Sequence, residues 1–325
     1  MAALRGVNLG GWLIIEDWMT PSLFSGVSAN DEYGFMQIKG ARAKLRRHQH
    51  EFITEQDFAW MASKGVQIVR IPVGYWVLHG DAPYVSAIGR LDWAFKMCKK
   101  YKILVLLDIH GLPGSQNGKN HSGRVGKPAW ANSKANVAKG FDITMELARR
   151  YVNSPVLWGV QIVNEPPVGL LQLRIRRYYR RAYRELVAIL PPRVRIVYSD
   201  GFTPRLMSGA LPTRAVMDIH WYHFVAWPFL RPFLYRFIIS LHRHTLRGLK
   251  RWNGVIIGEW SGTYSQKVFD MYPVAHHATM VRDSIAWQLA AYDQADAWFY
   301  WTYKTDLPGV WNFRSLVDDG ILPLK

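Results

Sequence analysis

Two glutamates, Glu165 and Glu259, each stand at the end of a short apolar run, in the segments IVNEP and IIGEW. Hydrolysis of the acetal between two sugars needs one carboxylic acid to protonate the leaving oxygen and one carboxylate to attack the anomeric carbon. In enzymes that retain the anomeric configuration, these carboxyl groups are about 5 Å apart. Either glutamate alone is more often a loop residue or a helix cap. Because 94 residues (259 − 165) separate the two, only the fold could bring them to one sugar.

Eight short apolar runs bounded by turn residues are typical of strands. They cover residues 6–9, 66–71, 103–109, 157–163, 194–199, 215–219, 254–258 and 297–301. Helical patterns occupy most intervals, at residues 54–64, 86–100, 133–151, 170–190, 232–250 and 281–294. Alternating strands and helices indicate a parallel sheet. The sequence therefore predicts an α/β fold, a (β/α)8 TIM barrel, as a single domain over residues 1–325.

Polar or aromatic side chains follow nearly every predicted strand, and in such a barrel the carboxyl ends of the strands meet at one mouth. Each side chain alone has an ordinary structural explanation, whereas a ring of polar groups is costly to bury without partners. A doubly wound open sheet remains an alternative, although it would concentrate its site at one switch point. The candidates around the two glutamates are Arg70, His110, Asn164, His220, Tyr222 and Trp301.

The chemistry suggests a role for each candidate. Glu165 must be protonated when substrate arrives, and we expect a nearby carboxylate and a partly dry cleft to disfavour its ionised form. Glu259 must stay ionised, so Arg70 is expected beside it and Tyr222 is expected to donate to it. We expect Asn164 to contact the sugar 2-hydroxyl. His110 and His220 are expected to bind sugar hydroxyls or orient the carboxylates, and Trp301 to form the floor of the sugar subsite.

The composition bears on binding partners. Aromatic residues make up 14 % of the chain, which favours sugar binding, although aromatic rings also fill cores. The net charge is +17, and much of it lies in residues 170–190, where arginines fall largely off an apolar helical stripe. We interpret this segment as the solvated outer face of a barrel helix. Nucleic-acid binding would need base-reading or stacking elements beside the charge, so we expect no nucleic-acid partner.

We also predict no metal and no cofactor. Cys98 is the single cysteine, which excludes a disulfide or a cysteine metal cluster within one chain. The histidines lack diagnostic metal-ligand spacing, and the glycines of GVNLGG lack the spacing of a dinucleotide loop. The N-terminal segment lacks the apolar region of a signal peptide, and the sequence leaves the compartment open.

Several long motifs occur in order along the chain: NLGGWLIIEDWMTPSLF, FITEQDFAWMASKGVQIVRIPVGYW, LLDIHGLPGSQNG, VNEPP, GEW, WFYWTYKTD and WNFRSLVDDGILP. In these motifs the chain resembles glycoside hydrolase family 5, and within it the exo-β-1,3-glucanase branch. The resemblance implies a retaining β-glycosidase on a TIM barrel, with Glu165 as acid/base and Glu259 as nucleophile. It also places Glu16 where that branch binds the non-reducing-end glucose, and Asn117 joins the candidate substrate-binding residues. Members of the family are often secreted.

Two segments depart from the branch. Where it shows a phenylalanine and acidic or amide residues that clamp the glucan, this chain has Lys119, Asn120 and His121. The second departure is a basic, aromatic-rich segment at residues 224–250. We interpret it mainly as a barrel helix that begins near Pro232. We expect its apolar stripe, Phe233, Phe237 and Leu241, to pack on the barrel. This packing does not account for Trp227, Phe229 and Leu230. Two alternatives for this segment are docking to an anionic membrane or glycolipid and an oligomer contact. The segment is too short and too charged to span a bilayer.

The sequence therefore predicts a monomeric, retaining, exo-acting β-glycosidase that cleaves a β-glucan or β-glucoside, with β-1,3-glucan or an oligosaccharide as the favoured substrate. One alternative is a membrane-associated glycolipid β-glycosidase. An alternative of another class is a saccharide-binding barrel without catalysis.

Overall fold

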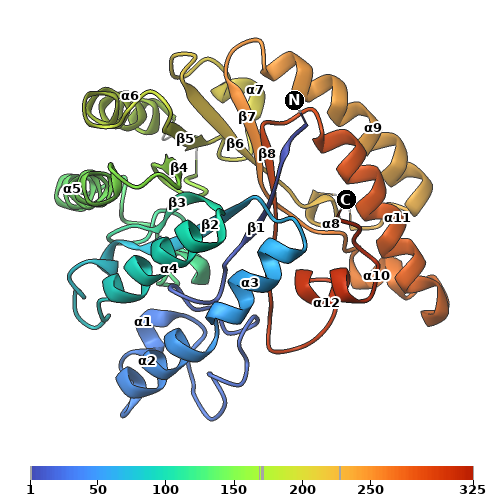
Figure 1. The fold of residues 1–325 in the computed structure, drawn as a ribbon, viewed down its shortest axis with the longest axis horizontal. Coiled ribbons are helices and arrows are strands. Elements are labelled where there is room, and N and C mark those ends of the chain that lie inside the picture. Colours follow the sequence, from blue (N-terminus) through green and yellow to red (C-terminus); the bar gives the residue numbers. More distant parts are fainter. Residues whose placement is uncertain (1, 168, 170–171, 227, 325) are drawn as a thin grey trace.

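The computed structural model describes residues 2–167, 169, 172–226 and 228–324, and in it eight parallel strands close into one barrel in sequence order (Figure 1). The barrel closes where the first strand pairs with the eighth, for example Val7 with Tyr300. The predicted TIM barrel is therefore confirmed, and all eight predicted strands are present with ends shifted by a few residues. They are β1 (Leu4–Asn8), β2 (Ile68–Gly74), β3 (Leu104–Gly111), β4 (Leu157–Gln161), β5 (Arg195–Ser199), β6 (Ala215–Trp221), β7 (Gly254–Trp260) and β8 (Ala297–Tyr300).

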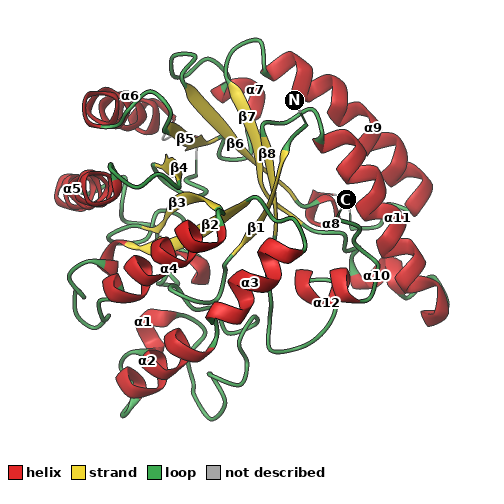
Figure 2. Cartoon of the chain, viewed as in Figure 1, coloured by secondary structure: helices red, strands yellow, loops and turns green. Residues whose placement is uncertain are grey.

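Helices surround the strands on the outside of the barrel (Figure 2). The six predicted helices correspond to α3 (Glu55–Ser63), α4 (Ile88–Tyr101), α5 (Lys134–Tyr151), α6 (Gln172–Ile189), α9 (Pro232–Leu249) and α11 (Val274–Tyr292). The expected first residues of α6, Leu170 and Leu171, lie outside the described residues. The arginines of α6 are largely exposed and Ile175, Tyr178 and Ala182 are buried, which confirms the solvated outer face.

The structure contains further short helices that the periodicity did not indicate. They are α1 (Glu32–Phe35), α2 (Ala41–Glu51), α7 (Pro204–Met207), α8 (His223–Ala226), α10 (Gln266–Phe269), α12 (Phe313–Asp318) and the 3-10 turns η1 (Tyr75–Val77) and η2 (Asn120–Ser122). Helix α2 buries only Ala41, Leu45 and Gln49, so it has almost no apolar stripe to detect. Helix α11 begins seven residues earlier than predicted because its first two turns are polar or exposed.

The barrel interior is layered. Its base is apolar and includes Ile68, Leu106 and Val216, which belong to one buried cluster. Two residues further along the same strands stand Arg70, Asp108 and Asp218, all completely buried. Side chains two apart on a strand share a face, so the same alternation that fills the base places a charged layer directly above it, towards the mouth. The layer also contains Gln161 of β4.

A bulge in β7 aims Glu259 at this interior. The register between β6 and β7 pairs Ile219 with Ile257 and then His220 with Glu259, which leaves Gly258 as the extra residue. Ile257 packs in the outer core, and a shift of one residue moves a side chain to the other face. Without the bulge Glu259 would point outwards with Ile257. With it, Glu259 shares the interior with His220.

Helix α9 corrects the expectation for the basic, aromatic-rich segment. Its buried residues are Tyr235, Ile239, His242, Leu246 and Leu249. Phe233, Phe237 and Leu241, which we expected to pack on the barrel, are instead exposed. Both sets have helical spacing, so periodicity alone could not decide which stripe faces the core. Trp227 lies outside the described residues.

Candidate active site

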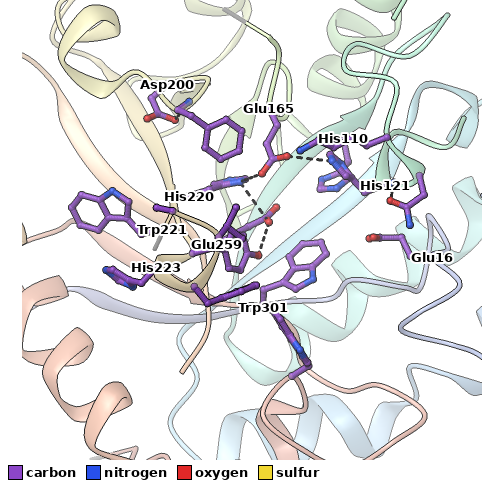
Figure 3. A pocket seen from close by; sticks show the side chains of 18 of the residues that line it. Glu16, His110, His121, Glu165, Asp200, His220, Trp221, His223, Glu259 and Trp301 are labelled. Carbon is purple, nitrogen blue, oxygen red and sulfur yellow. Dashed lines mark hydrogen bonds and ion pairs between the residues drawn. The ribbon is translucent and has the colours of Figure 1, made fainter. Parts of the chain in front are cut away.

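A cavity of about 540 Å³ opens at the carboxyl ends of the strands. Glu165, from the loop after β4, and Glu259, from the end of β7, both line it (Figure 3). One carboxylate oxygen of Glu165, one of Glu259 and a ring nitrogen of His220 all lie within 4.8 Å of one another. This separation matches the spacing of about 5 Å in retaining glycosidases and is shorter than the roughly 6.5–9.5 Å of inverting ones.

The backbone at Glu165 is in the left-handed region, with φ of +40°. A non-glycine residue there costs on the order of 1–3 kcal/mol and persists only where its surroundings impose it. Asn117 supplies one such restraint, since its side-chain amide donates to the Glu165 carbonyl over 3.2 Å. Asn117 itself is not among the residues that line the cavity. It therefore supports the Glu165 loop, and its expected contact with substrate stays a prediction.

Glu259 accepts hydrogen bonds on both carboxylate oxygens. Arg70 Nη1 donates to Oε1 over 2.9 Å, and the Tyr222 hydroxyl donates to Oε2 over 2.8 Å. Both donors stabilise negative charge on the carboxylate. The structure thus brings together the three residues as the sequence predicted.

Arg70 is completely buried and connects most of the charged layer. Its guanidinium donates to Asn164 Oδ1 over 2.9 Å and forms an ion pair with Asp108 at 3.0 Å. Burial opposes the charge, but Asp108, Glu259 and Asp218 raise the pKa of Arg70. The guanidinium is therefore a permanent cation beneath the glutamates. Asn164, fully buried beside it, places its amide nitrogen 3.3 Å from His110 Nε2.

Glu165 lies between two histidines. His220 Nδ1 is 2.7 Å from Oε1, and His121 Nε2 is 3.2 Å from Oε2. Burial alone would raise the pKa of Glu165, but the hydrogen bonds and charges of His121 and His220 hold it well below its usual range. The two histidines therefore favour the ionised form of Glu165, whereas we expected a nearby carboxylate and a partly dry cleft to favour the protonated form. Sequence reasoning missed the cause, because His121 comes from a loop that carries no periodic pattern.

His220 is held by carboxylates on both ring nitrogens, since its Nε2 lies 3.0 Å from Asp218 Oδ2. Burial opposes protonation, but Glu259 and Asp218 raise the pKa of His220 well above its ordinary value. His110 has the opposite state, because burial and the Arg70 charge lower its pKa well below the usual value. A neutral His110 with its proton on Nδ1 fits the 2.6 Å contact with Asp108.

Asp108 and Asp218 were also missed by sequence reasoning, although a signal exists. The tripeptide Asp-Ile-His occurs twice, at the ends of β3 and β6. Residues two apart on a strand face the same side, so each aspartate had to point inwards with its histidine. In both copies the aspartate contacts the histidine, at 2.6 Å in β3 and 3.0 Å in β6.

The far side of the cavity carries the remaining predicted residues. Glu16 lines it, and its Oε2 accepts from the Trp18 indole over 2.9 Å. Its Oε1 is buried and has no hydrogen-bond partner among the described residues. Burial raises the pKa of Glu16 to about 7. Trp301 also lines the cavity and stacks on His110 at 5.7 Å between ring centroids. Trp311, which the sequence did not single out, lines it as well.

The cluster of Glu165, His220 and Glu259 has the donor atoms of a metal site, but its hydrogen bonds are those of an acid and base pair. A metal ligand must offer a lone pair, whereas both ring nitrogens of His220 face carboxylates. A cation would also have to bind next to the Arg70 guanidinium. These three residues are therefore poorly suited to bind a metal ion.

Comparison with known proteins shows the family. The sequence profile described as Cellulase (glycosyl hydrolase family 5) matches residues 29–306. The chain belongs to this family. A "Probable glucan 1,3-beta-glucosidase A" of Aspergillus clavatus is 32 % identical over 98 % of the chain and 87 % of its own length. A "Glucan 1,3-beta-glucosidase" of Blumeria graminis is 30 % identical over 98 % of the chain and 86 % of its own.

A solved structure agrees with the barrel. The rutinosidase from Aspergillus niger superposes with a TM-score of 0.84 over 99 % of this chain and 98 % of its own, at 20 % identity; at that identity the likeness concerns the fold alone. The resemblance inferred from the motifs is confirmed. This family 5 protein is a glycoside hydrolase of the retaining type.

Proposed function

We propose that this family 5 enzyme removes glucose from the non-reducing end of β-1,3-glucans or short β-glucosides by double displacement, with Glu165 as acid/base and Glu259 as nucleophile. The observation that carries the proposal is that one carboxylate oxygen of Glu165 lies within 4.8 Å of one of Glu259. The substrate follows from the relatives, which are named glucan 1,3-beta-glucosidases.

Glu259 attacks the anomeric carbon while the leaving oxygen takes a proton from Glu165. Arg70 and Tyr222 orient the Glu259 carboxylate through its two oxygens. In the second half of the reaction, Glu165 removes a proton from water, the water oxygen attacks the anomeric carbon, and the bond to Glu259 breaks. Glu165 is ionised at this point because it has given its proton to the leaving group.

In the first half the proton must be supplied to Glu165. We assign its store to His220, whose Nδ1 lies 2.7 Å from Glu165 Oε1. Transfer from Nδ1 to Oε1 leaves His220 neutral and Glu165 protonated, and the proton then passes to the leaving oxygen. Asp218, held to Nε2, keeps His220 oriented and stabilises its charged form.

A glucose subsite is proposed between Glu16 and the tryptophans. The free oxygen of Glu16 can accept from sugar hydroxyls, and Trp301 and Trp311 offer faces for the apolar side of a pyranose. Asn164 is proposed for the 2-hydroxyl. Lys119, Asn120 and His121 line the cavity in place of the aromatic clamp expected from the branch, and Asn120 reaches towards the Glu16 side, where its amide donates to Asp17 over 3.3 Å.

The test is product analysis on a laminarin-type β-1,3-glucan, cellooligosaccharides and glucosylceramide in parallel. We expect glucose from the β-1,3-glucan, no release from glucosylceramide, and no turnover by Glu259→Gln on any of them. Near-normal hydrolysis by Glu259→Gln would show that Glu259 is not the nucleophile. Preferred release from glucosylceramide would instead support the glycolipid alternative, and no release from any substrate or an aryl β-glucoside would support a binding barrel.

One chain supplies every residue of this site, so we propose that the enzyme acts as a monomer. No cofactor enters the steps above.

A further inference from the structure

Helix α9 is apolar on two opposite sides. One side packs on the barrel through residues that include Tyr235, Ile239 and Leu246. On the other, Phe233, Phe237 and Leu241 follow each other at intervals of four residues and are 66 %, 62 % and 47 % exposed. Residues four apart lie on one face of a helix, so these three form a continuous apolar stripe in contact with solvent. The barrel does not require this second stripe.

Exposed apolar residues also precede α9 in the chain. Phe229 and Val225, which precede α9, are 60 % and 68 % exposed, and Val225 also lines the catalytic cavity. With Leu234 these residues make up what we term the α9 patch: Val225, Phe229, Phe233, Leu234, Phe237 and Leu241. Large apolar side chains gathered in this way differ from the isolated ones found on most surfaces and mark an interaction site.

The charge around the α9 patch is positive. No aspartate or glutamate occurs between Asp218 and Glu259, whereas Arg231 and Arg236 are exposed next to the aromatic residues. From the neighbouring helix α10, Lys267 places its ammonium 4.4 Å from the Phe229 ring centre. Acidic side chains on the neighbouring helices include Asp270 of α10, whose Oδ1 accepts from Gln266 over 2.7 Å, and the exposed Asp283 of α11. The partner must therefore combine an apolar layer with negative charge.

We propose that the α9 patch docks this enzyme on the surface of an anionic lipid bilayer. Aromatic and aliphatic side chains would enter the boundary between headgroups and acyl chains while the arginines and Lys267 contact lipid phosphates and carboxylates. The attachment is peripheral, since no helix in the described part of the chain is long and apolar enough to cross a bilayer. A bilayer fits better than a second copy of the chain, because the net charge of +17 opposes self-association at a basic surface.

Docking at this site has a consequence for access to the enzyme. Val225 belongs both to the α9 patch and to the cavity wall, so the mouth would lie beside the lipid surface. Glycosides near a membrane would reach the mouth over a short distance. The proposal concerns binding alone and holds whatever the preferred linkage proves to be.

The experiment is co-sedimentation of the full chain with vesicles of phosphatidylcholine containing about 30 % phosphatidylserine, at ~0.15 M salt. We expect the wild type to sediment with these vesicles and to remain in the supernatant with pure phosphatidylcholine. Phe233→Ser/Phe237→Ser should weaken vesicle binding by at least about tenfold, because two inserted rings are lost. Arg231→Gln/Arg236→Gln should weaken it as well and reduce its dependence on salt.

Leu173→Ser is the matched control, since Leu173 is 70 % exposed among the arginines of α6 and lies outside the α9 patch. It should bind vesicles like the wild type. Circular dichroism and hydrolysis of a soluble aryl β-glucoside verify that every variant is folded. Wild-type protein that stays in the supernatant, a Phe233→Ser/Phe237→Ser variant that binds normally, or an equal loss in Leu173→Ser would overturn the proposal. So would a dimer, in sedimentation velocity without lipid, that dissociates only in Phe233→Ser/Phe237→Ser.

Discussion

The bulge at Gly258 can be tested by adding a single methyl group. A β-carbon at Gly258 would lie 2.5 Å from Asp218 Cγ and 2.6 Å from its Oδ2, and closer still to Oδ1. Such distances do not occur between real atoms, so the Asp218 carboxylate must move in Gly258→Ala. Asp218 cannot move freely, because it accepts hydrogen bonds from Gln161 over 2.7 Å and from His220 over 3.0 Å.

The magnitude follows from these contacts. Overpacking a buried site costs about 1–3 kcal/mol, and loss of a hydrogen bond to a charged group costs about 1.5–3 kcal/mol more. We expect Gly258→Ala to lower the free energy of unfolding by roughly 3–6 kcal/mol in urea titrations. The melting temperature should fall by roughly 5–10 °C, and kcat should drop because His220 loses its partner.

Two further variants separate the causes. Gly258→Ala/Asp218→Ser removes the overlap but not the loss of the Asp218 hydrogen bonds, so only the overpacking cost of about 1–3 kcal/mol should be regained while kcat stays low. Gly89→Ala, in α4, is the matched control, since nothing lies within 4 Å of its added β-carbon, and it should gain up to about 1 kcal/mol. A Gly258→Ala enzyme with wild-type stability and kcat would refute the geometry described for the charged layer.

Three other predictions concern the ionisable groups. Because Asp218 is among the charges that raise the pKa of His220, Asp218→Asn should move the alkaline limb of the kcat/KM profile to lower pH; an unmoved limb would exclude His220 as the proton store. Glu16→Ala should raise KM for glucosides by about tenfold to hundredfold with a smaller change in kcat, and an unchanged KM would place the glucose elsewhere. Dialysis against EDTA should leave hydrolysis unchanged, whereas loss of activity that zinc or magnesium restores would show a metal at the glutamates.

Much of the fold could be predicted from the sequence because the strands of a parallel barrel are buried on both faces and appear as apolar runs. All of β2 is buried, for example. Helix α2 could not be predicted, because its sequence is mostly charged and its buried side is narrow. In α9 the prediction failed for a different reason. Both of its sides carry apolar residues at helical spacing, and only tertiary packing selects the one with Tyr235 and Ile239.

The candidate site was predictable where the side chains belong to the strands themselves, as with Arg70, His220 and Glu259. The ionisation of Glu165 was not, because it depends on His121, which reaches Glu165 from the loop at η2. Nor did the sequence show the contact that Asn117 makes. Asn117 lies close to Glu165 in space, yet its amide is used on the Glu165 backbone.

The central claim is that Glu259 attacks the sugar whose leaving group Glu165 serves. It is tested most directly by incubating the enzyme with a 2-deoxy-2-fluoro-β-glucoside that carries a good leaving group, which slows release of the covalent intermediate. Peptide mapping by mass spectrometry should then find one fluoroglucosyl group per chain, attached to Glu259. A label on Glu165 or another residue would contradict the assignment, as would rapid formation of the α-anomer of glucose from a natural β-glucoside.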